Sequence, residues 1–302
     1  MPIPATPLRT ALLTSVALLA FAGNSLLCRL ALKQTDIDAA SFTSVRLCSG
    51  ALVLALLVAW RGRGRAGSAP PWAAGDWTAG LALFVYAAGF SFAYLSLTAA
   101  TGALLLFGVV QTTMIGWGLW RGERLRPLQW AGLVAASAGL VWLLLPGLAT
   151  PPLQAGLLMG AAGVAWAVYT LRGRTAGGDP TALTAGNFLR AAPLALGLSL
   201  LTAAWARWDA AGLLLAVASG ALASGAGYAI WYTALRGLSA TRAAILQLAV
   251  PALAAAGGVL LLGEPLTPQL LGASLAVLGG VLLVILARAP APTALTPPRP
   301  AR

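Results

Sequence analysis

Ten apolar stretches, each long enough to cross a lipid bilayer, dominate this chain of 302 residues. In chain order they cover residues 10–32, 41–60, 79–98, 101–120, 128–146, 153–171, 183–205, 211–235, 241–262 and 268–287. About 20 mostly apolar residues span the hydrocarbon core as a helix, and continuous apolar runs favour helices over the alternating strands of a barrel. Hydrophobic residues make up 59% of the chain and charged residues only 9%, too little polarity for a water-soluble domain. The sequence therefore predicts an all-α integral membrane protein with ten transmembrane helices, referred to below as spans one to ten.

Residues 121–145 and 262–286 resemble each other. Both stretches carry a Gly-Glu pair near the start, and both repeat one spacing of Gln, Gly and Gly, at Gln129, Gly132, Gly139 and at Gln269, Gly272, Gly279. If each copy holds five helices, the odd number places the copies in opposite orientations in the membrane. We therefore predict two inverted five-helix repeats, residues 10–147 and 153–287, between a tail of residues 1–9 and a Pro-rich, disordered tail of residues 288–302.

The net charge of +12 has an uneven distribution along the chain. If the N-terminus is cytoplasmic, 14 basic residues lie on the cytoplasmic side, three (Arg29, Lys33 and Arg207) lie outside, and Arg46 and Arg190 fall within spans. The positive-inside rule then places both termini in the cytoplasm, and the charge needs no nucleic-acid partner to explain it. Residues 1–23 resemble a signal peptide, but the apolar run continues to Leu32, so we expect this segment to remain as span one.

Each predicted repeat has a Gly-Glu-x-Leu junction before its last helix, at residues 122–125 and 263–266. Over roughly residues 12–286, these features resemble the EamA-type members of the drug/metabolite transporter (DMT) superfamily. The chain is also similar to bacterial aromatic amino-acid exporters. This resemblance implies a secondary transporter of the bacterial inner membrane that exports aromatic and other neutral amino acids by alternating access, with cationic aromatic toxins as a further substrate class. It also implies a central cavity lined by spans one, three, four, six, eight and nine, with spans five and ten peripheral.

All five tyrosines fall in predicted spans three, six or eight. Tyr86 and Phe90 share one helix face with Tyr94, and Tyr228 shares a face with Tyr232. A cavity rich in aromatic rings would suit an aromatic side chain or a cation. The aromatic candidates for substrate binding are Tyr86, Phe90, Trp166, Tyr169, Tyr228 and Trp231. Helix packing is the alternative role for all of them, and packing or an interfacial belt is favoured for Tyr94, Tyr232 and the tryptophans near span ends.

Long polar side chains within spans complete the predicted site. Asn24, Gln111 and Gln247, from spans one, four and nine, could bind the ammonium or carboxylate of an amino acid, or could join neighbouring helices. Arg46 and Arg190 could capture a carboxylate, but snorkelling to the interface or contact with helix-end carbonyls is favoured. Glu123 and Glu264 are expected to stabilise the N-terminus of the helix that follows each of them.

The residues that are missing limit the mechanism. The chain has no histidine, and its seven acidic residues fall in loops or at span ends, which favours facilitated diffusion over proton coupling. Its only lysine, Lys33, follows Leu32, so the Walker A motif of ATPases is absent. We expect no enzyme activity, no cofactor and no metal site, because neither a nucleophile with a base nor a ligand cluster is visible.

Several alternatives stay open at this stage. Cys28 and Cys48 are expected to be buried free thiols rather than a disulfide. We expect the partners to be a small-molecule substrate, with an aromatic amino acid favoured, and the lipid bilayer; we expect no nucleic acid and a monomeric protein. The competing functions are a channel, an exporter of cationic drugs, a carrier of another metabolite such as a nucleotide sugar, and a proton-coupled antiporter.

Overall fold

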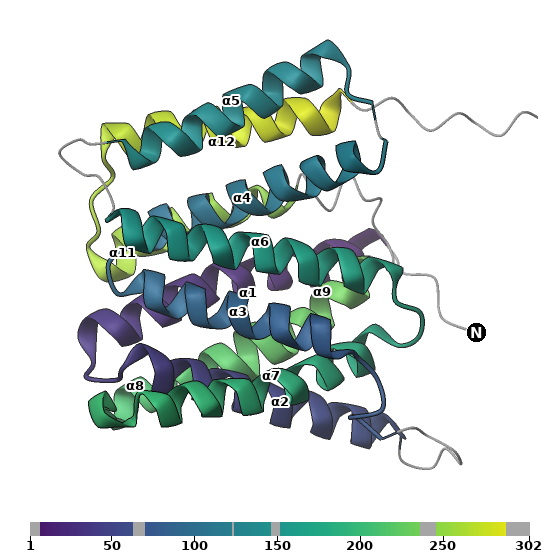
Figure 1. Ribbon diagram of the computed structural model, residues 1–302, viewed down its shortest axis with the longest axis vertical. Helices are drawn as coiled ribbons and strands as arrows, with labels where there is room; N and C mark the ends of the chain where they lie inside the picture. The colour runs from purple at the N-terminus through teal and green to yellow at the C-terminus, as the bar shows by residue number, and fades with distance from the viewer. Residues whose placement is uncertain (1–6, 63–69, 123, 146–151, 236–245, 288–302) are drawn as a thin grey trace, which may run out of the picture.

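A computed structural model describes residues 7–62, 70–122, 124–145, 152–235 and 246–287. All regular elements in these ranges are helical (Figure 1). The helices are α1 (Pro7–Gln34), α2 (Ala39–Gly62), α3 (Trp77–Tyr94), α4 (Ala99–Trp120), α5 (Pro127–Leu144), α6 (Leu153–Thr175), α7 (Pro180–Leu201), the 3₁₀-helix η1 (Ala203–Trp205), α8 (Ala210–Val217), the π-helix η2 (Ala218–Ala226), α9 (Gly227–Leu235), α11 (Ala249–Leu262) and α12 (Pro268–Leu286).

The protein spans a membrane several times. Eight helical segments are long and apolar enough to cross a bilayer, namely α1 to α6, the continuous segment of α8, η2 and α9, and α12. Helix α11 is a shorter apolar helix, and α7 has 22 residues but carries Asn187 and Arg190. Ten spans stay a prediction, because the start of the ninth predicted span lies outside the described residues.

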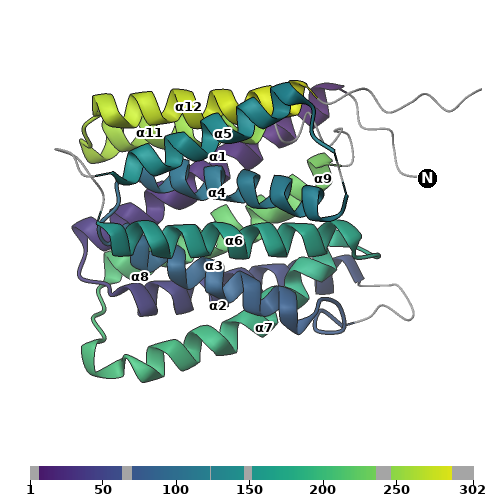
Figure 2. The same ribbon diagram turned by 45° about the horizontal axis from the view of Figure 1, so that its top comes forward.

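The helices form a bundle whose connections lie at its two ends (Figure 1). Helices α5 and α12 pack against each other at one side, and α2 and α7 pack together at the opposite side. Between them, α3 packs on α6, and α1 packs on α8, η2, α9 and α11. Figure 2 shows the same order from a second direction. The centre of the bundle is therefore built from both halves of the chain.

Side-chain caps and glycine place the helix ends where turns are needed. The side chains of five residues accept hydrogen bonds from the first-turn amides of α3, α4, α7, α8 and α12: Asp76, Thr98, Asp179, Asp209 and Thr267. Helix α11 ends at Gly263, whose φ of 62° lies in the left-handed region that favours glycine. These caps satisfy backbone groups that would otherwise lack partners at the ends of membrane helices.

The α1–α2 loop and the α7–α8 loop are joined by backbone and carboxylate contacts. Asp38 N–H donates to the carbonyl of Arg207 (3.2 Å), and Arg207 N–H donates to the carboxylate of Asp38 (3.0 Å). Burial acts to raise the pKa of Asp38, but hydrogen bonds from Ser41, Arg207 and Ala40 outweigh it and hold this pKa below its usual value. The two loops thus fix the positions of α2 and α8 at one end of the bundle.

A π-helical turn brings α2 and η2 into close contact. A side chain at Gly220 would collide with the carbonyl oxygen of Arg46 and the hydroxyl of Ser49. The same turn points Ser219 and Ser224 into the protein, where both are fully buried. π-helical turns often occur at functional sites, and this one lies against Arg46 on α2.

We expect Gly220→Ala to destabilise the protein, because the added methyl group has no room between η2 and α2. Overpacking of this kind costs about 1–3 kcal/mol. The matched control is Gly160→Ala on α6, where a side chain would meet nothing within 4 Å. Thermal unfolding in detergent should show a lower Tm for Gly220→Ala only; equal Tm values for the two variants would contradict this account of the contact.

Candidate functional site

A pocket lies near the middle of the bundle. Asn24 is ten residues from the C-terminal end of α1 at Gln34, roughly 15 Å along the helix. The pocket is lined by nine residues of α1, α3, α4, α6 and α9: Phe21, Asn24, Ser25, Tyr86, Phe90, Leu106, Phe107, Trp166 and Tyr228. All five helices belong to spans that were expected to line a central cavity. Helices α1, α3, α4 and α6 are spans one, three, four and six, and α9 is part of span eight. Span nine, which includes α11, contributes none of the nine.

Aromatic rings contact one another across the pocket and across the two halves of the chain. The ring centroids of Tyr86 and Trp166 are 4.7 Å apart, and those of Trp166 and Tyr228 are 5.1 Å apart. Phe90 packs on Tyr86 at 5.4 Å, and Phe21 meets Tyr228 edge-on at 5.8 Å. Aromatic pairs at these distances contribute about 0.5–1.5 kcal/mol each beyond the area they bury. The rings therefore form one connected cluster around the pocket.

The structure brings most of the nine candidate residues together. Asn24, Tyr86, Phe90, Trp166 and Tyr228 line the pocket. Tyr169 and Trp231 lie one layer behind, against Trp166 (5.4 Å) and Phe21 (5.6 Å) respectively. Gln111, buried on α4, and Gln247, half-buried just before α11, are not among the lining residues.

Four lining residues escaped the sequence analysis: Phe21, Ser25, Leu106 and Phe107. Phe, Leu and Ser are common throughout an apolar helix, so their types carry no signal. Helical periodicity could have placed Phe21 on the same face as Asn24 and Ser25, which follow it at steps of three and four, but it does not say which face of a membrane helix meets the cavity.

The pocket is almost filled by its own side chains. Its cavity volume is about 20 Å³, which is room for roughly one water molecule. A molecule much larger than water can enter this pocket only if the aromatic rings separate. This pocket is therefore closed in the described conformation.

Arg46 corrects a sequence-based interpretation. It was expected to snorkel to the membrane surface or to contact helix-end carbonyls, but it is only 1% exposed and its partners are side-chain hydroxyl groups. Its Nε donates to the Ser224 hydroxyl (3.2 Å) and its Nη2 to the Tyr86 hydroxyl (3.1 Å). The guanidinium carbon also lies 5.3 Å from the ring centre of Tyr86 and 4.9 Å from that of Phe90. Snorkelling fails because α3 and η2 cover this face of α2 and supply partners inside the bundle.

The Tyr86 hydroxyl joins three helices and the π-helical turn. It accepts hydrogen bonds from Arg46 and from Asn24 Nδ2 (3.3 Å), while Ser219 donates to Asn24 Oδ1 (2.6 Å). Asn24 thus both lines the pocket and holds α1 against α3 and η2. The two roles considered for this amide, a site role and a packing role, coexist in one network.

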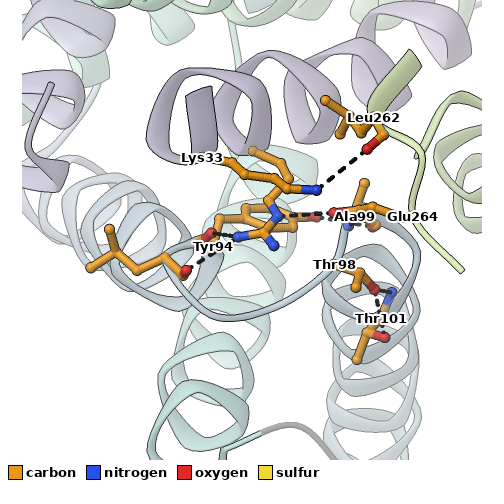
Figure 3. Close-up of polar contacts among 9 residues, drawn as sticks. Lys33, Tyr94, Thr98, Ala99, Thr101, Leu262 and Glu264 are labelled. Carbon is orange, nitrogen blue, oxygen red and sulfur yellow. Dashed lines mark hydrogen bonds and ion pairs between the residues drawn. The ribbon is translucent and has the colours of Figure 1, made fainter. Parts of the chain in front are cut away.

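A second polar cluster lies at the bundle end where α1, α3 and α11 finish and α4 begins (Figure 3). Arg29 Nε pairs with Glu264 Oε1 (2.9 Å), and Arg29 Nη1 donates to the carbonyl of Tyr94 (2.9 Å). Glu264 Oε2 accepts the backbone N–H of Ala99 (2.8 Å), and Lys33 Nζ donates to the carbonyl of Leu262 (3.3 Å). This cluster ties the α11–α12 junction to α1 and to the α3–α4 corner.

Glu264 and Arg190, two charged residues at or within the predicted spans, both have partners in the structure. Glu264 does stabilise a helix N-terminus, but that of α4 rather than of α12, because the α11–α12 junction folds back over the α3–α4 corner. Its counterpart Glu123 lies outside the described residues. Arg190 donates to the carbonyls of Trp72 and Ala74, in the loop before α3, and of Gly186 on its own helix, rather than to the helix-end carbonyls that were expected.

Tyr94 and the two cysteines follow the favoured interpretations. Tyr94 is fully buried and donates to the carbonyl of Ala99, so it packs rather than forming part of an interfacial belt. Cys28 and Cys48 are free thiols, although Cys48 is only half-buried.

We expect Glu264→Gln to lower stability, because it leaves the guanidinium of Arg29, only 12% exposed, without its counter-charge. Breaking a buried ion pair costs about 3 kcal/mol, a fall in Tm on the order of 5 °C. The control is Asp76→Asn, which breaks an ion pair with Arg172 whose side chains are 43% and 46% exposed. Asn keeps the α3 cap, so this change should cost less than about 1 kcal/mol. Similar losses for both variants would show that the Arg29–Glu264 pair is no stronger than a surface pair.

Comparisons with known proteins agree with this architecture. A model of the EamA-like transporter family matches residues 154–286. The uncharacterized protein PA1977 of Pseudomonas aeruginosa is 58% identical over 280 residues, which cover 93% of this chain and 96% of that protein. The threonine/homoserine exporter RhtA of Escherichia coli is 34% identical over 168 residues, 53% of this chain and 56% of the exporter.

A solved structure shares the fold. It is described only as the crystal structure of a protein, and it superposes with a TM-score of 0.62 at 22% identity, covering 93% of this chain and 98% of that one. Together with the helical membrane architecture and the sequence matches, this places the chain within a known group. The protein belongs to the EamA-like transporter family of the drug/metabolite transporter superfamily.

Proposed function

We propose that the protein exports neutral amino acids, including aromatic ones, across the bacterial inner membrane. The observation that carries this proposal is the pocket at mid-bundle, lined by aromatic rings together with one amide and three hydroxyl groups, two of which belong to tyrosines. Pockets of this kind, apolar with a few placed polar groups, suit small molecules. The similarity to a threonine/homoserine exporter supports amino acids as the class, and the rings support an aromatic side chain.

The transport unit in this proposal is a pair of inverted repeats, residues 10–147 and 153–287. Reciprocal contacts between α5 and α12 support it. Gln129, near the start of α5, donates to the carbonyl of Val284 at the end of α12 (3.1 Å). Its repeat counterpart Gln269, near the start of α12, donates to the carbonyl of Trp142 at the end of α5 (3.0 Å). Two equivalent helices that exchange equivalent bonds are what a two-fold axis in the membrane plane predicts.

The orientation follows from charge. With both termini in the cytoplasm, the ends of α2, α4 and α6 that carry arginines face the cytoplasm. The Arg29–Glu264 cluster then lies at the external end of the bundle. In this arrangement that cluster links helices on the outward side of the pocket, and the aromatic rings fill the pocket itself.

The mechanism in this proposal is rocking of the two repeats without proton coupling. Six acidic residues are described, and all lie outside the helix bounds: Asp36, Asp38, Asp76, Asp179, Asp209 and Glu264. Proton-coupled carriers place carboxylates or imidazoles within membrane helices, where protonation can change with conformation. Substrate would then move down its own gradient, out of the cell.

Counterflow tests the proposal. Liposomes with purified protein, preloaded with unlabelled amino acid, should transiently accumulate labelled Phe, Trp, Met, Thr or homoserine with saturable kinetics. Trp166→Ala should raise the KM for Phe about tenfold, because a stacked ring partner is lost. Trp208→Ala is the matched control, since Trp208 is 70% exposed and precedes α8.

The outcomes of this test distinguish two questions, whether the protein is an amino-acid exporter and which amino acids it prefers. No counterflow with any amino acid would refute the exporter proposal. Counterflow of Thr and homoserine without Phe would refute only the aromatic preference. Conductance without saturation would indicate a channel.

An imposed pH gradient tests the coupling. Because no acidic side chain lies within a described helix, we expect the rate and final level of uptake to be the same with and without the gradient. The measurement is labelled uptake in the same liposomes with inside-acid, inside-alkaline and equal pH. Accumulation driven by the gradient and abolished by a protonophore would show a proton antiporter instead.

A further inference from the structure

Arg46 is deeply buried but has no counter-ion in the part of the chain that the structure describes. Its Nε and Nη2 donate to two neutral hydroxyl groups, and its Nη1 finds no acceptor there. A guanidinium has five N–H donors, so most of its hydrogen-bonding capacity is unused. A buried polar group in this state calls for an explanation.

Two other arginines of the bundle make more complete sets of hydrogen bonds. Arg29 has a carboxylate partner and two backbone carbonyls. Arg190 makes three bonds to backbone carbonyls. These contacts hold helices and loops together, and this structural role explains why an arginine occurs at each of the two positions. Arg46 is more deeply buried than either and makes fewer hydrogen bonds, and a buried charge without a counter-charge is costly, so helix packing alone does not account for it.

The guanidinium of Arg46 lies directly behind the pocket wall. Arg46 is absent from the lining residues, but the rings of Tyr86 and Phe90, which do line the pocket, cover it at 5.3 and 4.9 Å. The Tyr86 hydroxyl is bonded to Nη2. Rotation of Tyr86 would expose the Nη1–Nη2 edge and enlarge the pocket in the same movement.

We propose that the Nη1–Nη2 edge of Arg46 binds the carboxylate of the transported molecule, and that its uncompensated charge keeps cationic molecules out of the pocket. The two-pronged edge of a guanidinium matches a carboxylate with two parallel hydrogen bonds. The carboxylate replaces the Tyr86 hydroxyl on Nη2, so binding and pocket opening are linked.

The amino group of the substrate is held differently. Within the described residues no acidic side chain lines the pocket, so an ammonium group meets ring faces and neutral oxygens instead. Zwitterionic amino acids and simple carboxylates therefore fit the site, whereas amines and cationic drugs do not. This inference rests on the proposed function and specifies which chemical group the site recognises.

Binding of three related compounds to the purified full-length protein tests the inference. Phenylalanine, 3-phenylpropionate, which lacks the amine, and 2-phenylethylamine, which lacks the carboxylate, differ only in the groups at issue. A second set, threonine, 3-hydroxybutyrate and 1-amino-2-propanol, covers a small polar substrate. The variants are Arg46→Gln and Arg46→Lys, with Arg207→Gln, an exposed arginine, as the control.

The wild type should bind the amino acid and the acid and reject the amine. Arg46→Gln should raise the Kd for the two carboxylates about tenfold to a hundredfold and reduce the discrimination against the amine. Arg207→Gln should behave as the wild type. If Arg46→Gln does not fold, as judged by gel filtration, Arg46→Lys decides, because lysine keeps the charge but cannot form the paired hydrogen bonds.

Unchanged carboxylate affinity in the folded Arg46 variant, or equal wild-type affinity for amine and acid, would overturn the inference. Amino-acid counterflow that is the same in the wild type and the Arg46 variant would also overturn it while leaving the proposed function intact. Arg46-dependent binding of 3-phenylpropionate or 3-hydroxybutyrate without amino-acid counterflow would support the carboxylate site and refute the proposed export of amino acids.

Discussion

Lipid offers no hydrogen bonds, so each polar group placed within the bilayer must find its partner inside the protein. The Tyr86 hydroxyl shows how this constraint organises the bundle. It accepts bonds from Asn24 on α1 and Arg46 on α2, and Ser219 of η2 completes the chain through Asn24. Helices from both halves of the sequence are thereby fixed around one point. The pocket lies at that point because the same side chains that satisfy one another also form its wall.

Two clusters of side-chain contacts link helices of the bundle, one at its centre and one at its end. At the centre, the rings of Tyr86, Trp166 and Tyr228 leave a cavity of about 20 Å³. At one end, Arg29 and Glu264 join α1 to the α3–α4 corner and the α11–α12 junction. The central cluster depends on ring contacts worth about 1 kcal/mol each, whereas the end cluster is built on an ion pair and hydrogen bonds to backbone groups.

Arg46 shows where sequence reasoning reached its limit. Its distance from the start of α2 indicated that its side chain could reach the membrane surface. The structure buries it instead, because η2 packs so closely on α2 that only glycine fits at residue 220. Spacing along one helix describes that helix alone, and the neighbour that covers a face comes from a distant part of the chain. The same reason explains why Gln111 and Gln247, good candidates by residue type, are not among the residues that line this pocket.

The sequence by itself determined the solvent, the helical class and the family, because length and apolarity of the spans are properties of single segments. It also indicated Asn24, Tyr86, Phe90, Trp166 and Tyr228, since polar and aromatic side chains are conspicuous in apolar helices. Only the tertiary structure decided which helix faces meet, and therefore that Phe21 and Phe107 join the pocket and that Glu264 caps α4. It also placed Arg46 behind Tyr86 with no counter-ion among the described residues. These features depend on contacts between segments far apart in the chain, and no local pattern encodes them.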